Sequence, residues 1–133
     1  MNAVITGVTG FAGSFLAEHL LAEEDRVLGC SRRGVWASFV PAHVRDAVPL
    51  ASWDFGQPLG STQVEQEILA FQPDCIYHLA GLSVPRDCGQ QLPNMLAAAV
   101  NIGGTAAVLD LAARLPRKPR VLLVSSALVY DLR

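Results

Sequence analysis

The chain has 133 residues, of which 51% are hydrophobic and 17% charged, and its net charge is −2. This composition is typical of one folded domain and excludes a disordered chain. The charge balance argues against binding to nucleic acid or to an anionic membrane. The apolar stretch at 121–130 is too short to span a bilayer, and Met1 begins no basic, apolar leader. We therefore expect a cytoplasmic protein without a membrane segment.

Apolar runs alternate with helical patterns along the chain, which indicates an α/β protein. Strands are expected at 2–6, 26–30, 48–53, 74–80 and 120–126, and helices at 11–24, 61–71 and 94–115, with Ser61 as an N-cap. The segments 34–48 and 81–93 are expected to be irregular. Apolar strands that alternate with helices form parallel sheets covered on both faces. We therefore predict one Rossmann-type domain over residues 1–133, a doubly wound sheet of about five strands in three α/β/α layers.

Ligands bind such sheets at the carboxyl ends of the strands, where the first turn here is rich in glycine. The sequence TGVTGFAG occupies residues 6–13, between the first strand and the first helix. Gly7 permits the tight turn, Gly10 lets the backbone approach a pyrophosphate, and Gly13 lets the helix pack on the strand. The helix N-terminus then offers amide groups to the phosphates. The alternative is a plain tight turn without a ligand.

The second strand ends in Ser31, Arg32 and Arg33. A site that prefers NAD carries an acidic residue here to hold the ribose 2′-hydroxyl, and this chain has none. An arginine can instead pair with a 2′-phosphate. The sequence therefore favours NADP(H) over NAD(H), against the alternative of a solvated basic loop.

Three further strand ends carry polar residues. Asp54, in Trp53-Asp54-Phe55, could accept a hydrogen bond from an adenine amino group, or it could simply form a turn. His78 is a candidate base, although a structural histidine is the favoured interpretation. Ser125 and Ser126 could hydrogen-bond a substrate oxygen, or they could be ordinary turn residues.

Together these motifs resemble the extended short-chain dehydrogenase/reductase family, whose NAD(P)-dependent epimerase/dehydratase group acts on nucleotide sugars. The resemblance covers the whole chain in the family's order: TGVTGFAG at 6–13, WDF at 53–55, YHLAG at 77–81, NIGGT at 101–105 and SSALVY at 125–130. With CSRRG at 30–34, the sequence is most similar to the GDP-mannose dehydratase and GDP-4-keto-6-deoxymannose reductase branch, which uses NADP(H). The resemblance implies a nucleotide-sugar substrate.

The resemblance also implies roles for individual residues. The glycine turn would hold the pyrophosphate, Ser31 and Arg32 would meet the 2′-position, and Asp54 would meet the adenine. Asn101 would support the active site from its helix, and Ser126 would be the catalytic serine. The implied cofactor-binding residues are Gly7, Thr9, Gly10, Phe11, Ala12, Gly13, Ser31, Arg32, Arg33, Asp54, Phe55, Leu79, Ala80, Gly81, Asn101, Val124 and Ser125.

Two departures from the family narrow the expected activity. Its 4,6-dehydratases have an acidic residue shortly after the catalytic serine, where this chain has Ala127 and Leu128, so reductase or epimerase chemistry is favoured. Asp131 also replaces the family's usual glycine. The family's proton donor is the tyrosine of a Tyr-x-x-x-Lys pair. The sole lysine, Lys118, follows Arg114 by four positions, so no such pair exists in these residues.

We therefore expect the N-terminal, cofactor-holding part of an oxidoreductase, without the substrate domain and inactive by itself. The alternative is a non-catalytic NAD(P)-binding or interaction module derived from that family. An uncovered fifth strand would leave an apolar edge, so we predict a homo-oligomer through residues 121–126. The three cysteines, Cys30, Cys75 and Cys88, fit no zinc spacing and are interpreted as buried small side chains, so no metal site is expected.

Overall fold

The computed structural model describes residues 1–56, 62–84, 88 and 94–126. Within them, five strands form one sheet in the order β3-β2-β1-β4-β5, and every neighbouring pair is parallel. The strands are β1 (Asn2–Thr6), β2 (Arg26–Ser31), β3 (Leu50–Ser52), β4 (Cys75–His78) and β5 (Arg120–Leu123). The predicted Rossmann-type sheet is confirmed.

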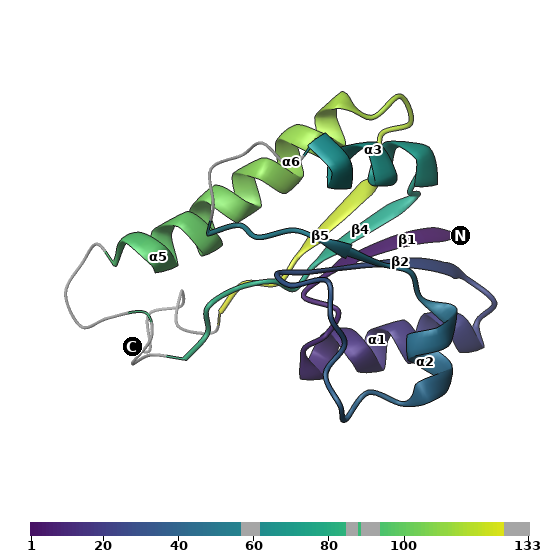
Figure 1. Ribbon diagram of the computed structural model, residues 1–133. Coiled ribbons are helices and arrows are strands. Elements are labelled where there is room, and N and C mark those ends of the chain that lie inside the picture. Colours follow the sequence, from purple (N-terminus) through teal and green to yellow (C-terminus); the bar gives the residue numbers. More distant parts are fainter. Residues whose placement is uncertain (57–61, 85–87, 89–93, 127–133) are drawn as a thin grey trace, which may run out of the picture.

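Helices cover the two faces of this sheet and complete three layers (Figure 1). On one face lie α1 (Phe11–Ala22) and α2 (Ala42–Ala47). On the other lie α3 (Thr62–Phe71) and a continuous helix made of α5 (Met95–Ala97), η1 (Ala98–Gly103) and α6 (Gly104–Arg114). Each loop at the carboxyl edge therefore leads from a strand towards one of two helical layers.

Two hydrophobic cores hold the layers together, one on each side of the sheet. Val4 and Ile76 pack under α3 and α6 with Ile68. Ala3 and Ile5, which alternate with Val4 along β1, pack under α1 and α2. The central strands are buried on both faces, as expected of uniformly apolar strands in a parallel sheet.

Several strand ends differ from the prediction. The last paired row across β1, β4 and β5 joins Thr6, His78 and Leu123. Beyond it the chain leaves β1 at Gly7, and the ladder ends there with hydrogen bonds from the Leu79 amide to the Thr6 carbonyl oxygen and from the Val124 amide to the His78 carbonyl oxygen. β3 has three residues where 48–53 was predicted. Apolarity predicts which residues face a core, but the number of partner residues sets the strand length.

Two helical features were not predicted. The segment 34–48 was expected to be irregular, yet it contains α2, a six-residue helix that buries Val44 and follows Pro41. So short a helix shows too little periodicity to be recognised. The helix expected at 94–115 includes the π-helical segment η1, at Ala98–Gly103. The predicted N-cap, Ser61, lies outside the described residues.

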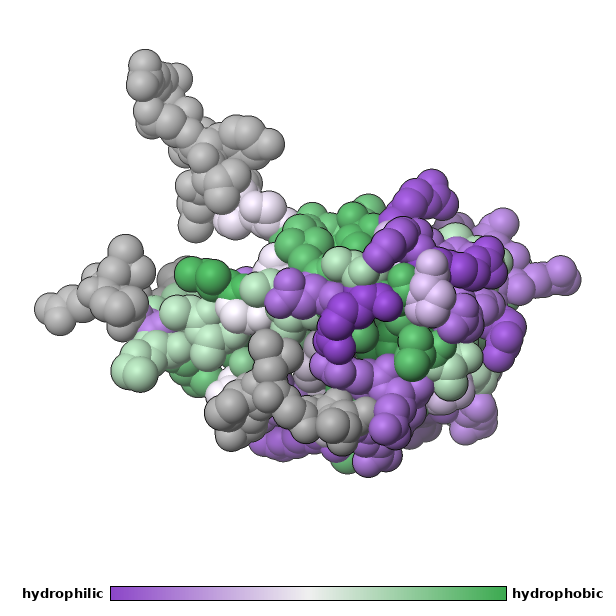
Figure 2. Space-filling view, turned by 90° about the horizontal axis from the view of Figure 1, so that it is seen from above, coloured by the Kyte–Doolittle hydropathy of each residue, from purple (hydrophilic) through white to green (hydrophobic). Residues whose placement is uncertain are grey.

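The run Met95–Arg114 has the length and apolarity of a membrane-spanning helix, which the sequence analysis did not note. In this structure its α6 part packs on the sheet through Ala107, Val108 and Leu111. Seen from above the view of Figure 1, the surface shows apolar residues interspersed with hydrophilic ones (Figure 2). The helix is therefore a layer of the α/β fold.

Candidate functional site

A cleft opens at the carboxyl edge of the sheet, where the predicted strand ends meet. It is bounded by the glycine turn after β1 and by the loops after β2, β3 and β4, with η1 at one side. The lining residues are Gly7, Thr9, Cys30, Ser31, Arg32, Trp53, Asp54, Phe55, Ala80, Gly81, Leu82 and Val100. Eight of them were singled out from the sequence, while Cys30, Trp53, Leu82 and Val100 were not. Val100 enters the lining from η1, and Leu82 enters it from the loop after β4. No local sequence pattern marks either residue as part of a cleft.

The glycines of the first turn differ in what they are needed for. Gly7 has φ +72°, and a β-carbon on it would lie 2.8 Å from the Ala80 amide nitrogen. A β-carbon on Gly13 would lie 2.7 Å from the Val8 Cα. The fold therefore requires both of these glycines. Gly10 is different, because it has φ −80° and a β-carbon there would meet only the Gly7 carbonyl oxygen, at 3.3 Å.

Helix α1 begins directly after Gly10 and offers an exposed N-terminus. The backbone amides of Phe11, Ala12 and Gly13 lie in its first turn, so the helix contains no carbonyl oxygen to which they could donate. No acidic residue lies in that turn, and the N-cap has no side-chain hydrogen bond. The Phe11 ring is 75% exposed and packs on Phe15, with 4.9 Å between the ring centroids. The turn is thus an open cradle that suits an anionic group.

The end of β2 contributes one buried hydroxyl and two arginines. Ser31 is buried, and its hydroxyl accepts a hydrogen bond of 3.1 Å from the Gly34 amide, which fixes the loop. The Ser52 hydroxyl donates to the Arg32 carbonyl oxygen at 3.2 Å. Arg32 lines the cleft with an exposed side chain, whereas Arg33 is exposed outside the lining. The cleft therefore carries one cation at this end.

Asp54 is the one acidic residue among the described lining residues. Its Oδ1 accepts a 2.9 Å hydrogen bond from the Gly56 amide, so the side chain forms the turn that was considered as an alternative. The ring of the next residue, Phe55, packs against the Trp53 ring, with 4.7 Å between the ring centroids. The carboxylate's second oxygen remains for a ligand, so forming the turn and meeting a ligand are compatible.

Asn101 is positioned by the π-helical segment and holds the loop after β4. Its Oδ1 accepts from the Leu82 amide at 2.8 Å, and its Nδ2 donates to the Leu82 carbonyl oxygen at 3.0 Å. Leu82 lines the cleft, but Asn101 does not. Asn101 therefore supports the site from outside, through a two-point contact that fixes one loop residue.

The described residues after β5, at 124–126, do not line this cleft. The Val124 amide donates to the His78 carbonyl oxygen at 3.2 Å, and its side chain is 59% exposed. Ser125 and Ser126 follow on the surface, while Ala127, Leu128, Tyr130 and Asp131 lie outside the described residues. Leu79, also predicted at the site, packs instead with the core beneath α1. The catalytic role of Ser126 stays a prediction.

The three cysteines differ in burial, although all of them were predicted to be buried. Burial raises the pKa of the Cys30 thiol to about 12, so it stays protonated. Cys75 is also buried, whereas Cys88 is only partly buried and its thiol donates to the Leu82 carbonyl oxygen at 3.3 Å, which corrects the prediction for that residue. In the part of the chain that the structure describes, no three metal-ligating side chains gather.

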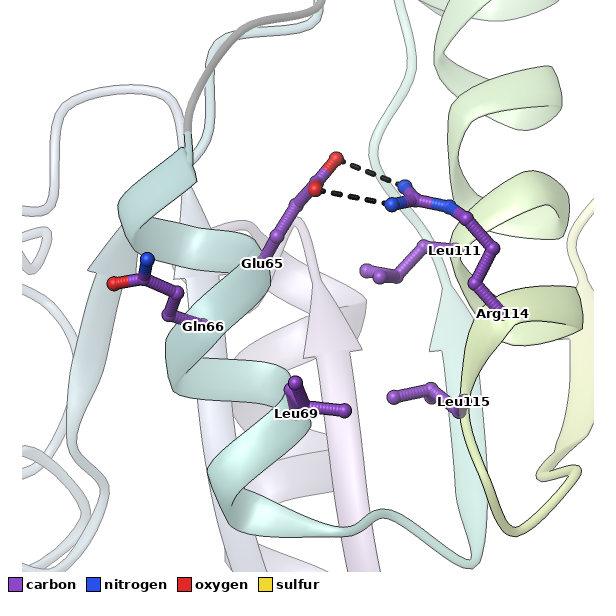
Figure 3. Close-up of a pocket in the computed structure, with 6 residues that line it drawn as sticks. All are labelled: Glu65, Gln66, Leu69, Leu111, Arg114 and Leu115. Carbon is purple, nitrogen blue, oxygen red and sulfur yellow. Dashed lines mark hydrogen bonds and ion pairs between the residues drawn. The ribbon is translucent and has the colours of Figure 1, made fainter.

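A second hollow lies away from the cleft, between α3 and the last turn of α6. An ion pair spans it, in which the Arg114 guanidinium contacts both Glu65 carboxylate oxygens, at 3.0 and 3.2 Å (Figure 3). Below the pair lie leucine side chains from both helices. The guanidinium and the carboxylate satisfy each other, so the two rim charges are already paired.

Comparison with known proteins agrees with this geometry. Residues 3–132 match the model of the NAD dependent epimerase/dehydratase family. The chain is 34% identical to GDP-mannose 4,6 dehydratase 2 of Caenorhabditis elegans over 96% of its own length and 35% of that protein. It is similar to a Thermus thermophilus UDP-glucose 4-epimerase solved in complex with NAD, with a TM-score of 0.66, 26% identity, and coverage of 84% of this chain and 33% of that one.

A third likeness concerns the fold alone. The UDP-glucose 4-epimerase of Bifidobacterium longum superposes with a TM-score of 0.79 at 19% identity, over 98% of this chain and 38% of that chain. The chain thus spans little more than a third of the length of these relatives.

Proposed function

The chain belongs to the NAD-dependent epimerase/dehydratase family, and on that premise we propose that it is the NADP(H)-binding part of a nucleotide-sugar reductase or epimerase. These residues span about a third of the relatives' length, so the activity and substrate of the whole protein are part of the proposal. A bound nicotinamide cofactor would supply hydride transfer to or from a sugar carbon.

Gly10 is the observation that carries the proposal. A methyl group there would ask only a small adjustment of the fold, because its one neighbour within 4 Å would be the Gly7 carbonyl oxygen, at 3.3 Å. A pyrophosphate resting on the first turn of α1 would not admit it, since its oxygens must reach the amides beside Gly10. A glycine that the fold constrains less than Gly7 or Gly13, at the mouth of an open helix N-terminus, supports a ligand that approaches the backbone closely.

The preference for NADP(H) rests on the end of β2. Arg32 lines the cleft there, and the acidic residue of an NAD site is absent from Ser31-Arg32-Arg33. The Thermus epimerase was solved with NAD, so the preference for NADP(H) rests on this chain's own residues and not on that relative. A guanidinium can contact a 2′-phosphate with two hydrogen bonds, which a 2′-hydroxyl cannot match.

In the proposed reaction, this chain's residues bind and orient. The first turn of α1 would hold the phosphates, Asp54 the adenine, and Ser126 a hydroxyl or carbonyl oxygen of the sugar. Ala127 and Leu128 offer no acid to expel water, so reduction or epimerisation is favoured over the dehydration named for the nematode relative. A proton donor of the Tyr-x-x-x-Lys type is absent from these 133 residues, and we propose that the chain as given turns over nothing.

A second candidate is a non-catalytic NAD(P)-binding or interaction module derived from the same family. The two candidates differ in what the reading frame encodes after Arg133. A Tyr-x-x-x-Lys sequence there would support the oxidoreductase, whereas unrelated sequence would support the module. Single-turnover hydride transfer by the purified chain would contradict the module and the proposed inactivity of these residues by themselves.

The test of cofactor binding is Gly10→Ala. Isothermal titration should detect NADPH binding to the wild-type chain and none, or binding at least about tenfold weaker, to the variant. Circular dichroism should show both proteins folded. The matched control is Gly103→Ala, which adds the same methyl group at a helical glycine outside the cleft lining. Equal NADPH affinity of Gly10→Ala and wild type would reject the phosphate-binding turn.

A further inference from the structure

Thr6 and His78 form a buried polar pair directly beneath the cleft. They are register partners on β1 and β4, in the last row of the sheet before the chain turns into the cleft loops. Thr6 is fully buried and His78 is 4% exposed. The Thr6 Oγ1 and the His78 Nδ1 are 2.7 Å apart. Neither residue belongs to the lining, so the pair lies beneath the residues that would touch a ligand.

The Thr6 hydroxyl has a second contact. Its oxygen accepts a 3.2 Å hydrogen bond from the Ala80 amide. The hydroxyl also bonds the His78 Nδ1, as donor or acceptor according to the imidazole tautomer. Burial lowers the pKa of His78 and favours the neutral ring, whose Nε2 is buried with no hydrogen-bond partner among the described residues. One chain of hydrogen bonds thus runs from the Ala80 amide through Thr6 to His78.

These hydrogen bonds fix the position of the Ala80 backbone, on which the cleft depends. The Ala80 amide nitrogen is the atom nearest to a β-carbon built on Gly7, at 2.8 Å. Gly7 and Ala80 both line the cleft. The His78 ring also contacts Phe55, another lining residue, in a T-shaped arrangement with 5.4 Å between ring centroids. His78 therefore touches or holds the loops after β1, β3 and β4.

We propose that His78 is a positioning residue for dinucleotide binding, which acts through Thr6 to fix Ala80 against the phosphate-binding turn. It is not the candidate base, because its Nδ1 is already hydrogen-bonded to Thr6 and its ring is buried below the lining. This inference rests on the proposed cofactor site. It adds that affinity for the dinucleotide depends on a residue that does not touch it.

The test compares variants that remove or keep the hydrogen-bonding group at the Nδ1 position. His78→Phe keeps an aromatic ring but removes that group, while His78→Asn places an amide oxygen or nitrogen at the same distance along the side chain. Thr6→Val removes the hydroxyl at nearly constant volume. We expect His78→Phe and Thr6→Val each to weaken NADPH binding by about tenfold, and His78→Asn to restore most of that loss. The Thr6→Val/His78→Phe double variant should lose no more than either single variant, because both act through one network.

A general loss of stability must be separated from this effect. Val44→Ala is the control, since Val44 of α2 is fully buried in the core that α1 and α2 share and does not line the cleft. It should lower the melting temperature without changing the NADPH affinity of the folded protein. A ¹⁵N spectrum of the histidines gives a second readout: the His78 ring should be neutral, and its signals should move when NADPH is added. Should His78→Phe fail to fold, Thr6→Val and the spectrum still decide.

The outcomes separate this proposal from the one before it. If the wild-type chain binds no NADPH, the proposed function fails. If it binds NADPH and both Thr6→Val and His78→Phe bind with wild-type affinity, the positioning role is wrong. It is also wrong if His78→Asn binds as weakly as His78→Phe, or if the His78 ring signals do not move when NADPH is added.

Discussion

Gly13 lies so close to Val8 that a β-carbon built on it would approach the Val8 Cα to 2.7 Å. The Val8 Cα is a backbone atom and the β-carbon is fixed directly to the Gly13 backbone, so neither can move aside without disturbing the junction of β1 and α1. Gly13→Ala should therefore destabilise the chain by about 1–3 kcal/mol or more. Gly10→Ala should cost about 1 kcal/mol or less, as a loss at a helix N-cap. Urea unfolding of both variants checks the contrast, and equal losses would contradict it.

Gly104 and Gly103 form a second contrasting pair. A β-carbon on Gly104 would lie 2.8 Å from the Phe55 ring, while one on Gly103 would meet nothing nearer than 4.0 Å. We expect Gly104→Ala to destabilise by about 1–3 kcal/mol and to displace Phe55, which packs on Trp53. Gly103→Ala should stabilise by about 0.5–1 kcal/mol, since alanine favours a helix.

Unfolding curves with near-ultraviolet circular dichroism measure both effects of these glycine variants. A Gly104→Ala protein with wild-type stability and an unchanged aromatic spectrum would show that Phe55 does not need this glycine.

The Glu65–Arg114 ion pair predicts a pH dependence of stability. The hydrogen bond from Arg114 lowers the pKa of Glu65 below its ordinary value of 4.5. A lowered pKa in the folded state adds stability that is complete above that ordinary value and is lost as the pH falls through the lowered one. Both side chains are partly exposed, so the effect is small.

Thermal unfolding between pH 3 and pH 7 checks the Glu65 prediction. Glu65→Gln should lower the melting temperature at neutral pH and leave it nearly unchanged at the acidic end. Glu23→Gln, at an exposed position after α1, is the control and should show no such difference. The prediction is wrong if Glu65→Gln and wild type differ by the same amount throughout.

β5 forms an apolar edge of the described sheet. Leu122, Leu123 and Val124 are 47%, 42% and 59% exposed, and β5 pairs with β4 alone. Unpaired apolar strands associate, so the purified chain should form dimers or larger species through residues 121–126. Val124→Lys should reduce this association, whereas Val35→Lys, at an exposed loop valine, should not. Light scattering that shows a monomeric wild-type chain at high concentration would contradict the prediction.

The sequence predicted the sheet because its signal is local. Val4 and Ile5 lie in an uninterrupted apolar run, and such runs are typical of strands buried on both faces. The glycine turn was equally readable, since the spacing of Gly7, Gly10 and Gly13 defines a known strand–turn–helix junction. Strand ends were less predictable, because Leu79 and Val124 are apolar and yet lie beyond the paired row.

The cleft was predicted only in part, because some of its walls depend on contacts between distant segments. Val100 enters the lining from η1, and no local pattern marks a π-helical segment. The link from His78 through Thr6 to Ala80 joins residues that are 72 and 74 positions apart in the chain. Periodicity shows which way a side chain points, but it does not show which partner it meets.

The central claim is tested most directly by calorimetric titration of the wild-type chain with NADPH and with NADH, repeated for Arg32→Ala. We expect NADPH to bind more tightly, and Arg32→Ala to weaken NADPH by about 1–3 kcal/mol while NADH changes little. Arg45→Ala, an exposed arginine on α2 outside the cleft, should bind both as the wild type does. Tighter binding of NADH by the wild type, or an equal loss of both dinucleotides in Arg32→Ala, would contradict the account.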